Sequence, residues 1–301
     1  MKLSLVIPCY NEEGNIKTIY SYVKEKYNKV KNYEMIFVNS GSCDNTYGEL
    51  KEISKDDKKC VKVLSFSRNF GKEAAMLAGL KYAKGDYICI IDADMQQDPM
   101  IVLNMLDILE KDDNYDVVAT YQEKRKEGKL LSFFKKKFYL IINAMSQVEF
   151  REGASDFRLF RRCVVEAILS LDEKVRFSKG IFSYVGYNTY YLPYVPEERV
   201  KGTSSFSFGK LLNYAITGIT SFSTNPLRIP IYLGITFLVV AFITFILFLF
   251  NATTVLGLVF LILFIGGLQF IMLGIIGEYL SQIHIESKNR PVYIIKEKIN
   301  I

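Results

Sequence analysis

One run of uncharged residues limits what this chain can fold into more than any other feature. From Ile229 to Gly277 the sequence contains no Asp, Glu, Lys or Arg, whereas the preceding residues carry charge at ordinary globular density. A helix needs about 20 apolar residues to cross a bilayer core. The run therefore predicts a two-helix transmembrane hairpin, with spans at 229–250 and 255–277 and a turn at 251–254. A buried hairpin in a soluble protein is the alternative.

Basic residues flank the uncharged run, and their placement predicts its orientation. They precede the first span and follow the second, while the turn carries no charge: Lys201, Lys210, Arg228, Lys288, Arg290, Lys296 and Lys298. Such flanks stay on the cytoplasmic side. The amino-terminal residues 1–8 predict a strand rather than a signal peptide. We therefore expect the cell inner (cytoplasmic) membrane, with both termini and the large domain on its cytoplasmic side.

Composition divides the chain into four parts. Residues 1–205 are expected to form a cytoplasmic domain, and 206–228, apolar with serines and without acids, a juxtamembrane interfacial helix. The hairpin at 229–277 and a cytoplasmic tail at 278–301 follow. Five cysteines show no paired spacing, as expected in a reducing compartment. The glycines of the second span would permit close helix contacts and so a homo-oligomer.

The net charge of +6 has a local source between residues 124 and 139. Basic residues alternate there with apolar ones, and Glu127 is the one acid in the stretch. A basic amphipathic segment suits an anionic membrane surface. A solvated charged helix is the alternative. We expect no nucleic-acid partner beside two membrane spans.

The first 120 residues alternate apolar β-branched runs with helical patterns. Strands are predicted at 3–8, 34–39, 61–66, 87–91 and 116–121, and helices at 12–26, 46–54, 72–83 and 99–110. Repeated strand–helix units predict an α/β fold with a mostly parallel, doubly wound sheet. Ligands of such sheets bind at the carboxyl edge of the strands. Polar loops follow four of the predicted strands, so we expect the site at that edge.

Two acids close the fourth predicted strand. Asp92 and Asp94 alternate, so one carboxylate can face the crevice while the other supports it. Mg²⁺ is usually held by one or two carboxylates and by substrate phosphates. The pair therefore indicates a metal-bridged diphosphate, with turn or helix-cap acids as the alternative. No G-x-G-x-x-G or P-loop motif occurs, so the common dinucleotide and P-loop folds lack their phosphate cradle.

Together these segments resemble glycosyltransferase family 2. The motifs are Val6-Ile-Pro-Cys-Tyr-Asn-Glu-Glu13, Val38-Asn-Ser-Gly-Ser-Cys-Asp-Asn-Thr46, Ser67-Arg-Asn-Phe-Gly-Lys-Glu-Ala-Ala75 and Asp92-Ala-Asp-Met-Gln96. Later segments extend the resemblance to the polyprenyl-phosphate (bactoprenol) glycosyltransferases, relatives of dolichol-phosphate mannose synthase: Ser155-Asp-Phe-Arg-Leu159, Arg176 to Gly186, Arg199-Val-Lys-Gly-Thr-Ser204, Gly218 to Ser223, Pro226-Leu-Arg228 and Arg290-Pro-Val-Tyr293.

The resemblance implies a GT-A (Rossmann-like) catalytic domain that transfers a hexose, with inversion, from a UDP-sugar to undecaprenyl phosphate. It implies a divalent metal, Mg²⁺ or Mn²⁺. The product would be a polyprenyl-monophosphate sugar for cell-envelope glycosylation, with a separate flippase and a downstream transferase as further partners. Glucose is the favoured sugar, and galactose, mannose and N-acetylglucosamine stay open.

The resemblance also implies roles for individual residues. The nucleotide-sugar site would comprise Pro8, Tyr10, Glu12, Asp44, Lys72, Asp92 and Gln96. Asp94 would bind the metal with Asp92 beside it, and Asp156 would lie at the acceptor phosphate with Arg158. Phosphate or acceptor contacts would come from Arg176, Lys179, Arg199 and Lys201. The chain departs from the branch at Asn39-Ser40, where two acids are usual, at Ser155, where Gly is usual, and at Gln97, where Asp is common.

The nucleophile suggests how the site would work. A phosphate monoester has a second pKa near about 6, so the acceptor scarcely needs a general base at cytoplasmic pH. We expect Asp156 to orient Arg158 or the metal shell, so Asp156→Asn would lower the rate without shifting the acidic limb of the pH profile. Base catalysis by Asp156 is the alternative. Cations at the reacting phosphates should contribute most to the rate. A salt bridge for Arg158 and a membrane-surface anchor for Lys201 are the structural alternatives.

Three rival functions are weighed against this one. A processive polysaccharide synthase of the same fold would use a Q-x-x-R-W motif, but the chain has no tryptophan. A transporter would need polar groups inside the spans, which hold no charge. A catalytically impaired membrane scaffold is the third, and Asn39-Ser40 is the feature that favours it.

Overall fold

The computed structural model describes residues 2–28, 30, 32–122, 143, 148, 151, 153–195, 220–223, 225–228, 230, 232–236, 239, 240, 242, 243 and 255–301. The chain divides into two compact units. The first, here called the sheet unit, comprises Met1–Tyr139, Phe150–Ser207 and Pro291–Ile301, and the second, the helical unit, comprises Leu140–Glu149 and Phe208–Arg290. The predicted basic stretch at 124–139 and most of the predicted interfacial helix at 206–228 lie outside the described residues.

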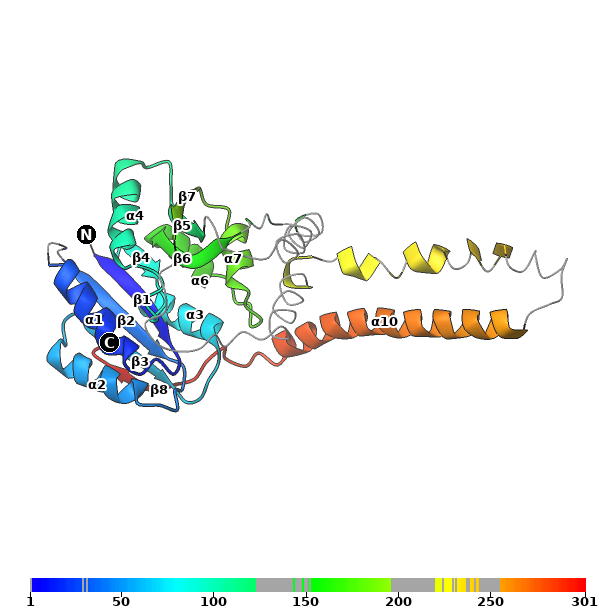
Figure 1. Cartoon of the computed structure of the whole chain (residues 1–301), viewed down its shortest axis with the longest axis horizontal. Helices are drawn as coiled ribbons and strands as arrows, with labels where there is room; N and C mark the ends of the chain where they lie inside the picture. The colour runs from blue at the N-terminus through cyan, green and yellow to red at the C-terminus, as the bar shows by residue number, and fades with distance from the viewer. Residues whose placement is uncertain are drawn as a thin grey trace. The chain divides into compact units, whose positions relative to one another are not determined.

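The sheet unit is built on eight strands in the order β7-β5-β6-β4-β1-β2-β3-β8 (Figure 1). Their bounds are β1 Leu3–Cys9, β2 Tyr33–Asn39, β3 Val61–Phe66, β4 Tyr87–Ile90, β5 Val117–Gln122, β6 Ala154–Arg161, β7 Thr189–Tyr194 and β8 Ile295–Ile299. β4, β1, β2 and β3 are parallel neighbours, and β5 pairs with β7 in parallel. β6 and β8 are antiparallel to the strands they pair with. The predicted α/β class is confirmed, but the sheet is mixed, with four parallel and three antiparallel strand pairs.

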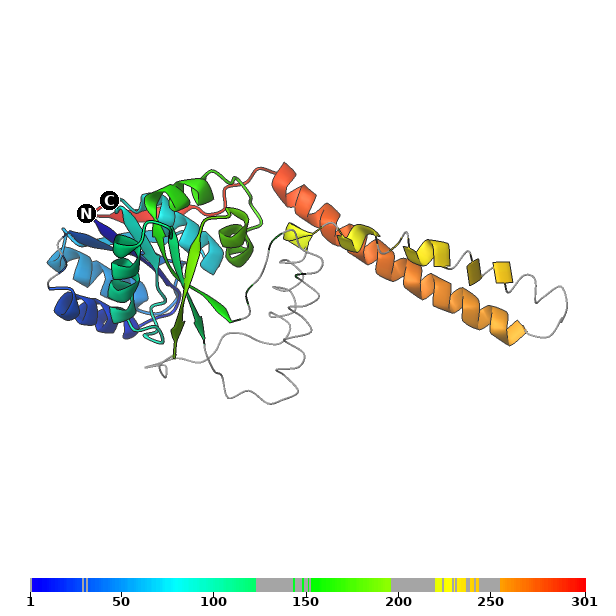
Figure 2. The same ribbon diagram turned by 90° about the horizontal axis from the view of Figure 1, so that it is seen from above.

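Helices cover both faces of this sheet (Figure 2). On one face α1 (Asn15–Lys26), α2 (Thr46–Asp56) and α4 (Met100–Lys111) bury their apolar sides in a core with alternate residues of β1 and β2. On the other, α3 (Lys72–Tyr82) packs on β1 and β2 and α6 (Arg162–Leu169) on β4 and β6. α3 lies so close to β1 that a Cβ atom at Gly79 would be 2.1 Å from Val6 Cγ1. α7 (Ser178–Tyr184) packs against β6.

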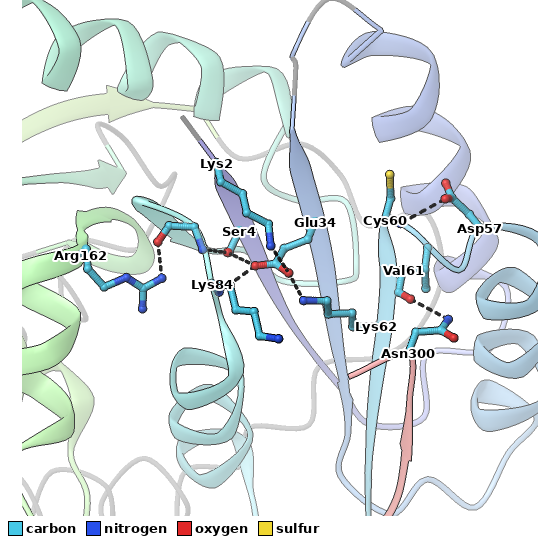
Figure 3. A network of polar contacts seen from close by, with 11 residues as sticks. Lys2, Ser4, Glu34, Asp57, Cys60, Val61, Lys62, Lys84, Arg162 and Asn300 are labelled. Carbon is cyan, nitrogen blue, oxygen red and sulfur yellow. Dashed lines mark hydrogen bonds and ion pairs between the residues drawn. The ribbon is translucent and has the colours of Figure 1, made fainter.

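A buried acid lies among cations at the edge of the sheet where the parallel strands begin (Figure 3). The Glu34 carboxylate accepts hydrogen bonds from Ser4 Oγ at 2.6 Å and from Lys84 N at 2.8 Å, and it also pairs with Lys62. Lys2 Nζ lies 3.2 Å from Glu34 Oε2. Burial alone would raise the pKa of Glu34, but the donors outweigh it and lower that pKa to about 2. This cluster is structural, since it lies at the end of the sheet opposite the predicted site.

The carboxyl-terminal residues return to the sheet as β8. This strand pairs antiparallel with β3, and Ser67 N donates a 3.0 Å hydrogen bond to Ile294 O just beyond it. Tyr293 stacks on Phe66 at 5.0 Å between ring centroids. Asn300 Nδ2 donates to Ser54 O and Val61 O. No strand was predicted in the tail at 278–301, and the structure places β8 there, at the edge of the sheet beside β3.

The helical unit contains one long helix, α10 (Val255–Ser287). Within the described residues it supplies the one segment long and apolar enough to cross a membrane, Phe264–Ser287. The helix continues past Gly277, where the second span was predicted to end, because Glu278 ends the uncharged run without interrupting helical hydrogen bonding. The predicted first span lies largely outside the described residues, although Tyr232–Thr236 are helical. The two-helix hairpin therefore stays a prediction.

Candidate functional site

The predicted site lies at the carboxyl edge of the parallel strands, where the first two loops are joined by hydrogen bonds. In the strand register Cys9 is opposite Asn39, so β1 and β2 end level with each other. Glu12 N donates to Thr46 Oγ1 at 2.8 Å, and Glu13 N donates to Asp44 Oδ2 at 3.1 Å. These contacts fix the β1–α1 loop against the start of α2.

Four residues predicted for the nucleotide-sugar site lie at the end of β1 or in the loops that follow β1 and β2. Pro8 is at the end of β1, Tyr10 follows with an exposed ring, and Glu12 accepts a 2.7 Å hydrogen bond from Asn15 Nδ2. Asp44 also accepts from Thr46, and although burial raises the pKa of Asp44, hydrogen bonds to its carboxylate lower it overall. Asp44 therefore stays ionised and holds this part of the site rigid.

Asn39 and Ser40, where two acids are usual in the resembling branch, bond within the protein. Asn39 is buried, its Nδ2 donates to Ser65 Oγ at 3.1 Å, and its Oδ1 accepts from Ser42 N and Oγ. Ser40 Oγ donates to Asn69 Oδ1 at 3.2 Å. The backbone of Gly41 has φ +64°, and a Cβ atom there would lie 2.4 Å from Arg68 C. The Asn39 amide and the Ser40 hydroxyl would recognise a nucleotide base only in competition with these contacts, which leaves the main-chain groups of the loop for that role.

Lys72 connects the two halves of the site. It is the first residue of α3, and its Nζ lies 2.6 Å from Asp92 Oδ1 and 3.4 Å from Asp156 Oδ2. Asp92 follows β4, and Asp156 lies on β6, the antiparallel neighbour of β4. Burial disfavours the Lys72 ammonium, but the two carboxylates outweigh it and raise the pKa of Lys72. A permanent positive charge is therefore held between the predicted donor and acceptor residues.

Asp156 is ionised in this surrounding. Burial alone would raise the pKa of Asp156, but the charges of Lys72, Lys179 and Arg158 lower it overall. Among the described residues, no donor reaches the buried Oδ1 atom of Asp156 within hydrogen-bond distance. A carboxylate with a lowered pKa is a weak base, which fits an orienting group better than a general base.

Asp92 and Asp94 follow β4 with different surroundings. Gln97 is buried and makes two contacts with Asp92: Gln97 Oε1 accepts from Asp92 N at 2.9 Å, and Gln97 Nε2 donates to Asp92 Oδ2 at 3.0 Å. Gln96 N donates to Asp94 Oδ1 at 3.2 Å. Both oxygens of Asp92 are therefore engaged, one by Lys72 and the other by Gln97.

Only some of the basic residues predicted at the reacting phosphates lie near Asp156 in the structure. Arg158 is buried on β6, donates from Nε to Ser155 O at 3.0 Å, and lies over the ring of Phe182. Arg176 donates to Leu171 O at 3.0 Å and to Ile168 O, so its guanidinium binds main-chain carbonyls that follow α6 or end it. Lys179, in α7, is near enough to Asp156 to affect its pKa. The predicted Arg199 and Lys201 lie outside the described residues.

Sequence reasoning gave no role to two residues at this site. Gln97 was noted only as a departure from the branch, yet it holds Asp92. Glu73 directly follows Lys72, and its Oε2 accepts hydrogen bonds from Ser178 N at 3.0 Å and from Ser178 Oγ. Neither contact has a sequence signal, because Ser178 is more than a hundred residues from Glu73 along the chain.

This chain is similar to several known proteins. The model of the family described as glycosyl transferase family 2 matches residues 4–169. The putative glycosyltransferase CsbB of Bacillus subtilis strain 168 is 39% identical over 98% of this chain and 91% of its own length. The bactoprenol glucosyl transferase of Shigella phage SfV is 41% identical over 99% of both chains.

Among solved structures, mannosyl-3-phosphoglycerate synthase from Rubrobacter xylanophilus is similar over 72% of this chain and 71% of its own, at 16% identity and a TM-score of 0.48. The family match contains Asp44, Lys72, Asp92, Asp94 and Asp156, which the fold gathers at the carboxyl edge of the sheet. With the match and these relatives, we conclude that the chain belongs to glycosyl transferase family 2.

Proposed function

We propose that this protein transfers glucose, with inversion, from UDP-glucose to a polyprenyl phosphate of the bactoprenol type. The observation that carries the proposal is the 41% identity, over 99% of both chains, to a bactoprenol glucosyl transferase. The similarity covers α10 as well as the sheet unit, so it includes the part that would meet a lipid acceptor. The lysine between Asp92 and Asp156 agrees with a reaction that joins two phosphate-bearing substrates.

The proposed chemistry starts from an acceptor that is already a nucleophile. The second pKa of a phosphate monoester is about 6, so its oxygen is largely deprotonated at neutral pH. Lys72, Lys179 and Arg158 would offset the repulsion between this oxygen and the donor diphosphate. Asp156, held ionised by the same cations, would orient them. The acceptor oxygen bonds to the anomeric carbon of glucose, and UDP leaves with the electrons of the broken glycosidic bond.

We propose a divalent cation at Asp94, with Asp92 beside it. Mg²⁺ usually takes one or two carboxylates, and substrate phosphates and water complete its shell. Within the described residues no three Asp, Glu, His or Cys side chains form a metal group of their own. This donor set fits a metal that binds together with the diphosphate, whose leaving-group charge the metal would neutralise.

The proposed arrangement places the sheet unit on the cytoplasmic side of the inner membrane. It retains spans at 229–250 and 255–277, an interfacial segment at 206–228, and a tail at 278–301 that supplies β8 to the sheet. Support comes from the apolar helix Phe264–Ser287, whose residues are not buried in the protein, and from the basic residues on both sides of the uncharged run.

A lipid-transfer assay tests the proposal. The full-length protein in mixed micelles with undecaprenyl phosphate receives radiolabelled UDP-glucose, UDP-galactose, UDP-N-acetylglucosamine or GDP-mannose, with Mg²⁺, Mn²⁺ or EDTA. We expect label in the lipid fraction from UDP-glucose, dependent on the metal and lost in Asp94→Ala. Label from another donor would replace glucose, and label only in water, or no turnover, would overturn the transfer reaction.

Asp107→Asn serves as the matched control for Asp94→Ala. Asp107 is on the exposed side of α4, where its carboxylate pairs with Lys111. We expect Asp107→Asn to transfer glucose at the wild-type rate. If Asp94→Ala did so as well, Asp94 would not hold the metal.

A further inference from the structure

Glu73 is a half-buried acid for which the proposed reaction has no use. It follows Lys72 in the first turn of α3, but the two side chains go to different partners. Lys72 contacts Asp92 and Asp156, whereas the Glu73 carboxylate accepts two hydrogen bonds from Ser178, the first residue of α7. One turn of helix thus contacts both the reacting centre and a distant helix.

α7 carries residues that face the same centre. Lys179 follows Ser178 directly, and its charge helps to lower the pKa of Asp156. Phe182, one turn further on, lies under the guanidinium of Arg158 at 4.9 Å from ring centroid to Cζ. The place of Lys179, and of the ring that lies under Arg158, therefore depends on where α7 begins.

We propose that Glu73 is a positioning residue, which fixes the start of α7 against α3 so that Lys179 and Arg158 face Asp156 opposite Lys72. The inference rests on the proposed glucosyl transfer for its kinetic test. The two hydrogen bonds from Ser178 to Glu73 support this proposal, because they join α3 and α7, which are far apart in the sequence. A helix start held by one carboxylate moves when that carboxylate is lost, and a misplacement of about 1 Å can lower a rate about 100-fold.

The surroundings of Glu73 make this contact sensitive to pH. Burial and the nearby Asp156 raise the pKa of Glu73 to about 7, against the opposing effect of Ser178 and Lys72. Arg176, before α7, and Lys179, within it, are the other charged groups that interact with Glu73. The ionised carboxylate is the stronger acceptor for the two Ser178 donors. The contact should therefore weaken as the pH falls below about 7.

Three variants separate the geometry from the charge. Glu73→Ala removes the acceptor, Glu73→Gln keeps an acceptor oxygen at every pH, and Glu166→Gln changes an exposed acid on α6 as the control. We expect kcat for glucosyl transfer to fall about 10–100-fold in Glu73→Ala with little change in the KM for UDP-glucose. In Glu73→Gln we expect most of kcat to be kept.

The pH profile of kcat distinguishes positioning from mere stability. In the wild type we expect a fall below about pH 7, set by Glu73. In Glu73→Gln the fall should begin only near about pH 6, where the acceptor phosphate takes up its proton. A profile unchanged in Glu73→Gln, or an unchanged kcat in Glu73→Ala, would overturn the proposal.

Hydrogen exchange of residues 177–185 in the full-length protein tests the same contact without any turnover. After correction for intrinsic exchange, we expect protection in the wild type to rise between pH 6 and 8, to be lost in Glu73→Ala and to be independent of pH in Glu73→Gln. Equal protection in the wild type and Glu73→Ala would refute the role of Glu73 even if the protein transferred no glucose. Inactive wild-type protein with the expected protection would refute the proposed function instead.

Discussion

Gln97 and Asp92 form a reciprocal pair, in which the glutamine accepts from the aspartate main chain and donates to its side chain. Because the second oxygen of Asp92 contacts Lys72, Gln97 fixes the carboxylate that in turn fixes the lysine. In the resembling branch this position is commonly an acid. In this chain the Gln97 amide donates to the Asp92 carboxylate at every pH, whereas an acid at this position could donate only when protonated.

Replacing Gln97 should therefore slow the reaction. Gln97→Leu removes the Gln97 partners of Asp92 N and of the half-buried Asp92 Oδ2, which costs about 1–3 kcal/mol, or roughly 10–100-fold in rate. Gln97→Glu keeps the acceptor for Asp92 N but sets two carboxylates against each other, so it should also lose rate, and least at low pH. Steady-state transfer assays check this prediction. Gln122→Leu is the control, because the Gln122 amide donates to the Tyr194 hydroxyl and not to Asp92. A Gln97→Leu rate equal to that control would contradict the assignment.

Replacing Lys72 should lower the rate of transfer more than replacing Gln97. Its removal in Lys72→Met leaves Asp92 and Asp156 without their shared cation, and removes a positive charge from the proposed site of the two phosphates. Loss of one preorganised electrostatic contact typically costs about 100–1000-fold in kcat. Lys72→Arg keeps the charge in a different geometry and should recover only part of the rate. Lys111→Met, which breaks an exposed ion pair with Asp107, is the matched control and should be fully active.

The pH profile of Asp156→Asn tests whether this group orients or accepts a proton. If Asp156 orients the surrounding cations, its amide variant loses rate but keeps an acidic limb. The structure adds a detail that the sequence did not contain. Asp156 raises the pKa of Glu73, so its removal should move the limb to lower pH rather than leave it unshifted. Complete disappearance of the limb would instead favour base catalysis by Asp156.

The strands that sequence reasoning located best are those with continuous apolar runs. β3 has the predicted bounds, and β1, β2, β4 and β5 begin and end within a residue or so of the prediction. These runs are buried on both faces, so tertiary contacts reinforce the local preference. Asp44, Asp92 and Asp94 follow these strands in loops, and Lys72 begins α3; parallel topology brings them to one edge.

What sequence reasoning could not find depends on distant partners. β8 reads Ile-Lys-Glu-Lys-Ile, a short alternating segment that becomes a strand only because β3 offers an unpaired edge more than two hundred residues earlier. Neither Gln97 nor Glu73 belongs to a sequence motif that would have indicated its contacts. The assignment of Arg176 to the acceptor stays a prediction, since its donors meet the carbonyls of Ile168 and Leu171.

Glu34 should make the stability of the sheet unit depend on pH in the acid range. Its pKa is about 2 in the folded protein against 4.5 ordinarily, so it stabilises the fold fully above about pH 4.5 and progressively less as the pH falls toward 2. The shift corresponds to roughly 3 kcal/mol. Thermal unfolding of full-length protein between pH 7 and 3 should show this loss.

The Glu34 variants identify the source of that dependence. Glu34→Gln should unfold at lower temperature at pH 7 and depend less on pH, because it leaves Lys62 buried without its carboxylate. The double variant Glu34→Gln, Lys62→Met should regain part of the stability. An equal acid sensitivity in wild type and Glu34→Gln would assign the effect to other carboxylates.

Variants of the carboxyl-terminal segment test whether β8 and Tyr293 help to position Lys72. Tyr293 stacks on Phe66, and Ser67 N bonds to Ile294 O, so the tail holds the end of β3 from which the loop to Lys72 departs. Tyr293→Ala removes an aromatic pair worth about 0.5–1.5 kcal/mol beyond its buried area. We expect a lower unfolding temperature and a reduced rate of transfer. Lys296→Ala, on the exposed side of β8, should change neither.

Removal of residues 291–301 should have a larger effect, because it exposes the main-chain groups of β3 along an unprotected edge. The truncated protein should lose both stability and transfer. A stable but inactive truncated protein would show that β8 acts on the Lys72 loop rather than on the fold as a whole. Full activity without residues 291–301 would mean that the β3–β8 pairing and the Phe66–Tyr293 contact have no part in positioning Lys72.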